Sequence, residues 1–276
     1  MGTPASFVVT ADNVYWHVSD SDSEIRRRYD IRENRPPDVR TVSVQITPPE
    51  WQRYDLPLGE WVCRVWQHAL PIWYDLKGIE ARCRRALSEW AKARLVLPGQ
   101  TRDCYDGDRL IVCGGRVNNV HQGGVVESVL QGGVVRTVLE GGTVCNVGRD
   151  GVVWNVRDGG IVQTVEAGGT VGRVDDGVLR AVLPGGTVER VAGNGVVMHC
   201  AGAVDVAQDC ALVRIHGGGI VRNAHNDATV IACGKWTGAV LKSKRSVMVH
   251  RTESGIDIST GRVGNIVLYE DSNAPV

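Results

Sequence analysis

The feature that most constrains this chain is a nine-residue phrase that recurs between about Cys113 and Gly195. Each unit begins with two small turn-forming residues and has an aliphatic residue at its fourth and seventh positions. The successive units read GGRVNNVHQ, GGVVESVLQ, GGVVRTVLE, GGTVCNVGR, DGVVWNVRD, GGIVQTVEA, GGTVGRVD, DGVLRAVLP and GGTVERVAG. One unit cannot bury its own two apolar side chains, whereas stacked neighbours can. A short fixed period of this kind therefore predicts a solenoid.

The calcium-binding repeats of toxins share this length and the opening Gly-Gly, but they differ at the positions that hold the ion. Those repeats need glycine at the fourth position and aspartate at the sixth, where the carboxylates ligate calcium. In this chain the fourth position holds Val126, Val135, Val144, Val153 and Val162, and the sixth holds Ser128, Thr137, Asn146, Asn155 and Thr164. Because valine cannot ligate calcium, the pattern predicts an apolar bore instead.

The remaining interpretation is a single-stranded parallel β-helix. Two units make one coil of about 18 residues, and each coil rises by one strand spacing of ~4.8 Å. Glycine pairs occupy the corners, where a positive φ is accessible without a side chain. A looser form of the pattern continues to Val240, which gives about eight or nine coils in a rod of roughly 40 Å. We expect the segment after Ser246 to cap the C-terminal end.

The GG-x-V-x-x-V phrase resembles the passenger repeats of adhesin-type autotransporters, and those of diffuse-adherence adhesins in particular. The resemblance covers residues 113–240 and nothing before them. It implies a β-helical stalk that presents a surface for binding.

The composition divides the chain into two parts. Six of the eight tryptophans lie before Ala91, whereas only five of the 34 glycines precede Cys113. Residues 1–104 therefore predict a small tryptophan-rich α+β domain, and residues 105–276 predict the β-helix with its C-terminal cap. We expect the first domain to cap one end of the solenoid, because an uncovered end would expose unpaired strand edges.

Two elements of the N-terminal domain can be assigned from their periods. Valine and isoleucine alternate with polar residues over 42–46, which is typical of a half-buried strand. Over 75–94, Leu76, Ile79, Cys83, Leu87 and Trp90 recur at steps of three and four residues, which predicts a helix. Asp75 is a suitable N-cap for that helix.

Composition also excludes several classes of protein. The net charge is zero and the sequence pI is about 7.0, so we expect no nucleic-acid partner. No apolar run approaches the roughly 20 residues that span a bilayer, so we expect no membrane partner. The eight cysteines form no C-x-x-C, and the N-terminal residues lack the pattern of a signal peptide. We therefore expect reduced thiols, no cofactor, no metal, and a cytoplasmic bacterial or phage protein.

One corner of the predicted coil carries a ladder of polar residues. At 18-residue spacing the column contains Gln122, Glu140, Asp158, Asp176 and Asn194. Glycosidases use carboxylate pairs at defined separations, so Glu140, Asp158 and Asp176 are the catalytic candidates if the protein cleaves a glycan. The structural alternative is that turn corners favour aspartate and asparagine for their backbone geometry.

Candidate contact residues come from tryptophans and a basic cluster. Trp154 occupies an outward-facing polar position of the repeat, and tryptophan is enriched in binding hot spots. The full set of candidates for a partner-binding surface is Trp154, Trp51, Trp61, Trp66, Lys242, Lys244 and Arg245. For the N-terminal tryptophans the alternative is a place in the core, since tryptophan is highly buried on average.

The sequence therefore predicts a non-enzymatic interaction protein with a rigid β-helix as its scaffold. Another protein is the expected partner, as it would be for a phage- or bacterium-encoded effector that binds a cellular protein. One alternative is a tailspike-like β-helix that binds or cleaves a glycan. A second alternative is a structural protein that assembles into a homo-oligomer through the ends or faces of the rod.

Overall fold

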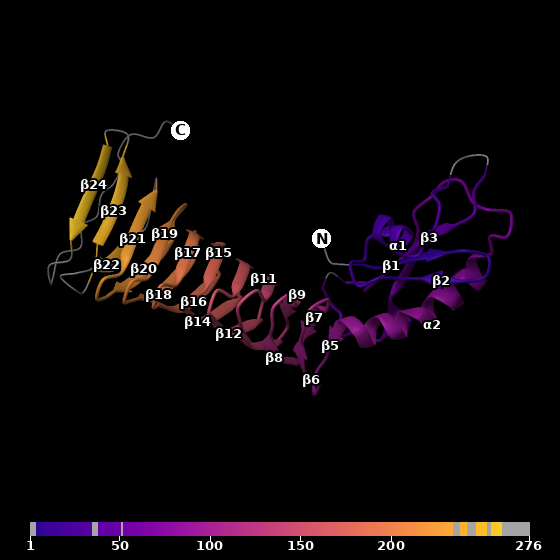
Figure 1. Cartoon of the computed structure of the whole chain (residues 1–276), viewed down its shortest axis with the longest axis horizontal. Coiled ribbons are helices and arrows are strands. Elements are labelled where there is room, and N and C mark those ends of the chain that lie inside the picture. The colour runs from indigo at the N-terminus through magenta and orange to yellow at the C-terminus, as the bar shows by residue number, and fades with distance from the viewer. Residues whose placement is uncertain are drawn as a thin grey trace. The chain divides into compact units, whose positions relative to one another are not determined.

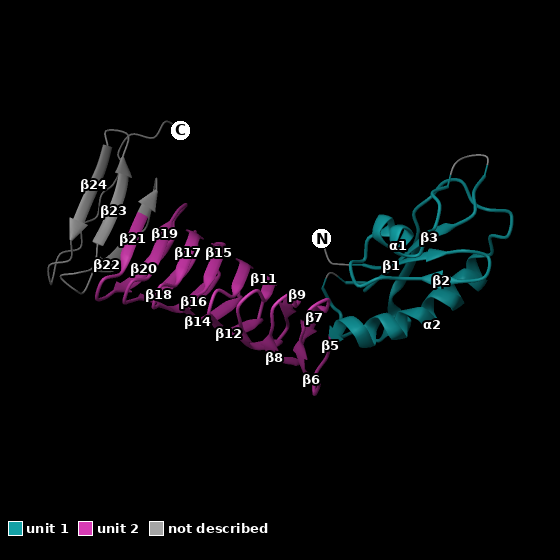
Figure 2. Ribbon diagram, viewed as in Figure 1, with its two compact units in different colours: residues 1–95 teal, residues 96–276 magenta. Residues whose placement is uncertain are grey.

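The computed structural model describes residues 4–34, 38–50, 52–233, 238–241, 247–252 and 255–260, with side chains described as far as residue 231. The chain forms two compact units, unit 1 (Met1–Leu95) and unit 2 (Val96–Val276). Figure 2 colours these units separately.

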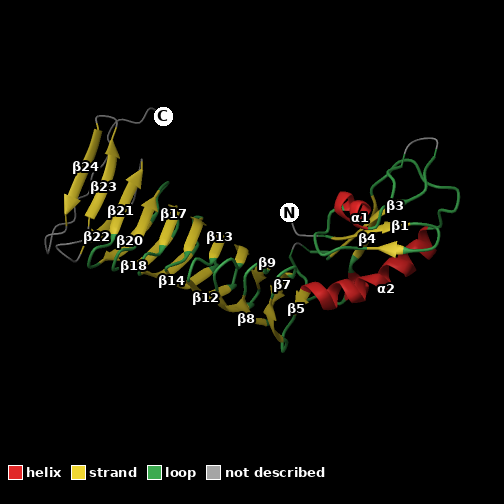
Figure 3. Ribbon diagram, in the orientation of Figure 1, coloured by secondary structure: helices red, strands yellow, loops and turns green. Residues whose placement is uncertain are grey.

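Unit 1 contains an antiparallel sheet with the strand order β2-β1-β3-β4, and helices (Figure 3). Its elements are β1 (Ala5–Val9), β2 (Val14–Tyr15), α1 (Asp22–Arg28), β3 (Val42–Thr47), η1 (Leu58–Glu60), β4 (Val62–Val65) and α2 (Leu76–Arg94). The predicted strand is confirmed as β3, in which Val42, Val44 and Ile46 are buried and alternate with half-buried residues.

The predicted helix is confirmed as α2, and its predicted N-cap is confirmed as well. The carboxylate of Asp75 accepts hydrogen bonds from the backbone N–H groups of Lys77 and Gly78, at 3.2 and 2.9 Å. These bonds satisfy two donors that have no partner within the helix. The predicted face is buried except at Leu76, the first helical residue, whose side chain is exposed.

Unit 2 contains a parallel β-solenoid of about eight turns, which begins at Leu95, the last residue of unit 1, and extends to residue 231 (Figure 1). Its strands alternate between a nine-stranded sheet, which holds the even-numbered strands from β6 to β22, and an eleven-stranded sheet, which holds the odd-numbered strands from β5 to β23 together with β24. The strands are β5 (Leu95–Val96), β6 (Thr101–Cys104), β7 (Arg109–Cys113), β8 (Arg116–Val120), β9 (Val125–Leu130), β10 (Val134–Val138), β11 (Thr143–Val147), β12 (Val152–Arg157), β13 (Ile161–Val165), β14 (Thr170–Asp175), β15 (Val178–Val182), β16 (Thr187–Ala192), β17 (Val196–Cys200), β18 (Ala203–Ala207), β19 (Leu212–Ile215), β20 (Ile220–Ala224), β21 (Thr229–Cys233), β22 (Gly238–Leu241), β23 (Val247–Thr252) and β24 (Gly255–Thr260).

The register confirms that two nine-residue units form one coil. Val134 of β10 pairs with Val152 of β12, one full 18-residue period later. Some coils towards the C-terminus are shorter, as in the pairing of Thr187 with Ala203. The fourth and seventh positions point into the bore throughout. The valines there, such as Val153 and Val156, are completely buried, so each coil adds the same apolar contact to the core.

Glycine at the corners is required by backbone conformation and by space. Gly132 has φ of +78°, in the left-handed region that favours glycine. At Gly142, an added Cβ would lie 2.4 Å from the carbonyl oxygen of Val120 in the preceding coil. The corner glycines therefore allow successive turns of the backbone to stack directly on each other.

The solenoid begins earlier in the sequence than predicted. Strand β6 already pairs in parallel with β8, so the solenoid begins before the predicted boundary after residue 104. At the other end β24 runs antiparallel to β23 and ends the parallel stacking. The predicted cap after Ser246 includes this pair of strands.

Candidate functional site

The site lies on the outer face of the nine-stranded sheet, at the fifth position of the repeat. Adjacent strands pair Val135 with Val153 and Val153 with Val171. This register places Arg136 of β10, Trp154 of β12 and Gly172 of β14 side by side along the face. Glu189 of β16 follows Gly172, since Val171 pairs with Val188. We call the area around these four residues the Trp154 face.

Trp154 is the aromatic centre of this face. Its side chain is 43 % exposed. The guanidinium of Arg116, on β8, lies 5.8 Å from the centroid of the indole ring, and that of Arg136 lies 6.0 Å from it. Each such cation–π contact stabilises an exposed ring by about 0.5–1 kcal/mol. The two arginines therefore hold the indole in place without covering it.

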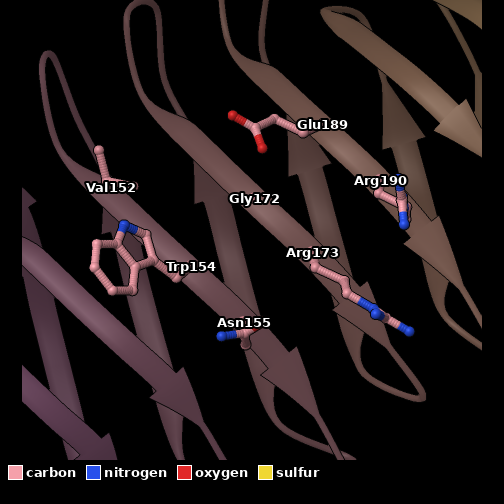
Figure 4. A pocket seen from close by; sticks show the side chains of 7 residues that line it. All are labelled: Val152, Trp154, Asn155, Gly172, Arg173, Glu189 and Arg190. Carbon is pink, nitrogen blue, oxygen red and sulfur yellow. The ribbon is translucent and has the colours of Figure 1, made fainter.

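A depression opens beside the ring because Gly172 has no side chain. It has a volume of about 400 Å³ and is lined by Val152, Trp154, Asn155, Gly172, Arg173, Glu189 and Arg190. Figure 4 shows the indole of Trp154 and the carboxylate of Glu189 on opposite sides of Gly172. A Cβ at residue 172 would lie 2.8 Å from the carbonyl oxygen of Trp154, so a larger residue is excluded by backbone as well.

The charges of the Trp154 face are mostly positive. Arg173 pairs with Asp175, with 2.8 Å between Nη2 and Oδ2. In the described part of the chain, Arg116, Arg136 and Arg190 have no carboxylate oxygen within 4.0 Å, and all three are exposed. Unpaired arginines on one face attract anionic groups, and their planar donors fit carboxylates and other oxyanions.

Asn155 lines the depression and also forms a hydrogen bond to the neighbouring coil. Its Nδ2 donates to the carbonyl oxygen of Arg136, one coil away, at 3.2 Å. Asn223 makes the same bond to the carbonyl oxygen of Asp205, also at 3.2 Å. The sixth position, where these residues lie, thus supports hydrogen bonds between coils, and Asn155 is held rigidly beside Trp154.

The tryptophans proposed as contact residues have different places in the structure. Trp61 is 1 % exposed and packs edge-on against Tyr54 and Trp90, with ring centroids 5.9 Å apart in both pairs. Its assignment to a contact surface was wrong, because it is a core residue of unit 1. Trp66 is 64 % exposed and follows β4. Trp51, Lys242, Lys244 and Arg245 lie outside the described residues.

Two of the three carboxylates of the predicted ladder, those of Asp158 and Asp176, make contacts within or between the turns. Asp158 and Asp176 have φ of +54° and +59°. One oxygen of Asp176 accepts hydrogen bonds from the backbone N and Nδ2 of Asn194, at 2.7 and 2.9 Å. Asp158 pairs with Arg157 at 3.4 Å, and Glu140 is exposed. These contacts favour the structural interpretation of the ladder, in which its residues stabilise the corners.

The described residues contain no group of three or more side chains able to hold a metal ion. His199 and His216 form a pair of imidazoles, with 3.3 Å between Nδ1 and Nε2. Burial lowers the pKa of His216, and His199 and Arg214 lower it further. Two imidazoles beside an arginine do not make a cation site.

Comparison with known proteins gives no family for this chain. No protein-family model matches it, and no curated protein matches it. The resemblance to autotransporter passenger repeats therefore depends on the repeat phrase alone. Among the described residues, no helix combines the length and apolarity needed to cross a bilayer.

Proposed function

We propose that the chain is a non-enzymatic interaction protein whose solenoid presents the Trp154 face to another macromolecule. The observation that carries this proposal is the exposed Trp154, which the guanidinium groups of Arg116 and Arg136 contact, beside a depression in the outer face of the sheet. Soluble proteins gain little by exposing a tryptophan, whereas tryptophan and arginine dominate binding hot spots.

The solenoid suits this role because it is rigid. The outward residues of each coil are fixed by the valines beneath them and by the parallel pairing on both sides. A surface that is ordered before binding loses little conformational entropy when it binds. The same argument does not support catalysis, because the ladder carboxylates Asp158 and Asp176 are engaged within the turns.

A photo-crosslink tests the proposal without assuming the class of partner. The full chain would carry the photoreactive residue p-benzoylphenylalanine in place of Trp154. A matched control would carry it in place of Arg180, an exposed residue of β15 in the other sheet. In a lysate of the cells that produce the protein, irradiation should give a discrete adduct from position 154 and only background from position 180.

Competition makes the result specific. Excess unlabelled wild-type protein should suppress the adduct, and the same amount of the Trp154→Ala variant should suppress it less. Equal labelling from both positions, or no adduct from position 154, would contradict the proposal. Circular dichroism of each variant would confirm that the solenoid is intact.

A further inference from the structure

The lining of the depression is polar apart from two side chains. Val152 and Trp154 supply its apolar surface, whereas Asn155, Arg173, Glu189 and Arg190 supply hydrogen-bond donors and acceptors. An aliphatic anchor from a protein partner would need an apolar pocket, which these residues do not provide. A ring that has an apolar face and a rim of hydroxyl groups fits this lining much better.

Glu189 separates two classes of anionic ligand. The side chains of an acidic peptide carry no neutral hydroxyl group, so a run of them meets Glu189 only with a carboxylate, and like charges repel. The hydroxyl groups of a sugar would instead donate hydrogen bonds to Glu189, and charge-assisted bonds of this kind are strong. Arg116, Arg136 and Arg190, which are exposed and have no carboxylate partner among the described residues, favour negative charge in the ligand.

We infer that the Trp154 face binds an anionic saccharide. One sugar ring stacks on the indole of Trp154 above Gly172, its hydroxyl groups bond to Glu189 and Asn155, and its carboxylate or sulfate groups pair with the arginines. This inference rests on the proposed function, since it names the ligand of the same face. Successive coils repeat every ~4.8 Å, so an extended saccharide can contact several coils.

Isothermal titration of the full chain with defined probes tests the inference. The probes are an oligogalacturonate hexasaccharide, which carries carboxylates, a heparin-derived hexasaccharide, which carries sulfates, and a neutral dextran-derived hexasaccharide. We expect binding of at least one anionic saccharide, about tenfold weaker binding of the neutral one, and weaker binding at higher salt. The two anionic probes distinguish carboxylate from sulfate as the group that is recognised.

Two pairs of variants locate the binding. Trp154→Ala and Arg136→Glu should each weaken binding of the anionic saccharide by about tenfold. Trp66→Ala and Arg180→Glu make the same chemical changes at an exposed position of unit 1 and at an exposed position of the other sheet of the solenoid, and they should leave the affinity unchanged. An equal loss with Arg180→Glu would show unspecific attraction to positive charge and would overturn the inference.

A glutamate hexapeptide distinguishes failure of this inference from failure of the proposed function. If it binds in a Trp154-dependent way and no saccharide does, the ligand is an acidic peptide and the inference is wrong, but the face remains a binding surface. The inference is also wrong if no probe binds while the position-154 photo-crosslink persists. If the crosslink and all probes fail, both proposals are wrong.

Discussion

The core of unit 1 is built from large side chains that each make one particular contact, whereas the core of the solenoid repeats one small contact many times. In unit 1, Trp61 and Trp90 pack edge to face, and the indole N–H of Trp90 donates to Asp20 at 2.6 Å. In the solenoid, valine stacks on valine from coil to coil. A core of the first kind depends on a few residues, and a core of the second kind distributes its stability over many.

The strongest test of this comparison is the buried ion pair of unit 1. Arg94 and Asp20 lie 2.6 Å apart, with side chains that are 0 and 2 % exposed. Asp20→Ala leaves a buried arginine without its carboxylate, which should destabilise unit 1 by about 3–5 kcal/mol. Urea unfolding should show an early loss of tryptophan fluorescence, since most tryptophans lie in unit 1. The β-sheet circular dichroism signal should persist to higher urea concentration, and coincident transitions would contradict the comparison.

A single substitution in the bore should have a smaller effect. Val153→Ala removes part of a completely buried side chain and should cost about 2–3 kcal/mol. The loss should be similar at Val135, because the two residues occupy the same place in adjacent coils. Thermal unfolding followed by circular dichroism would compare the two variants, and clearly unequal losses would show that the coils are not equivalent.

Alkaline pH should weaken the solenoid through its buried thiols. Burial raises the pKa of Cys200 to about 11 and that of Cys104 to about 12. In the unfolded chain a thiol ionises near pH 9. The stability that comes from burying the neutral thiol is therefore fully present below pH 9, and it is lost as the pH rises towards the pKa of the folded state. As the pH rises from 9 to 10.5, each buried thiol should lower the free energy of unfolding by about 1–2 kcal/mol. Urea midpoints would measure this loss, and Cys200→Val, which restores the residue typical of that position, should reduce it.

The smallest effect is expected at the hydrogen bond between coils. Asn155→Ala removes the 3.2 Å bond to the carbonyl oxygen of Arg136 and should cost about 0.5–1 kcal/mol. Asn223→Ala removes the equivalent bond and is the matched comparison. Urea unfolding of both variants measures the loss of unfolding free energy. A loss larger than that of Val153→Ala would contradict the conclusion that the buried valines contribute most of the stability of the solenoid.

The repeat made the solenoid predictable from sequence. Its coil length, buried positions and corner glycines all follow from one short period, because each contact joins residues at a fixed spacing. The shorter coils, such as that between Thr187 and Ala203, follow from losses of residues within the phrase. The helix of unit 1 was predictable for the same reason, since its period is local.

Contacts between distant residues of different type were not predictable. No pattern marks Asp20 as the partner of Arg94, and no pattern distinguishes the buried Trp61 from the exposed Trp66. Trp154 was correctly placed on the outside, but its neighbours Arg136 and Gly172 were missed. The 18-residue spacing that produced the carboxylate ladder would also have aligned these three residues, had it been applied to the fifth position.

Gly172 has a consequence for how the solenoid can be recognised. A solenoid resembles a one-dimensional crystal, and a ligand that read only the average surface could slide from coil to coil without preference. The missing side chain is a point defect in that lattice, because it occurs beside the one outward tryptophan among the described coils. Gly172 therefore breaks the translational symmetry of the coils and makes one place on the solenoid different from its neighbours. A ligand that fits there binds once per chain and in a single register.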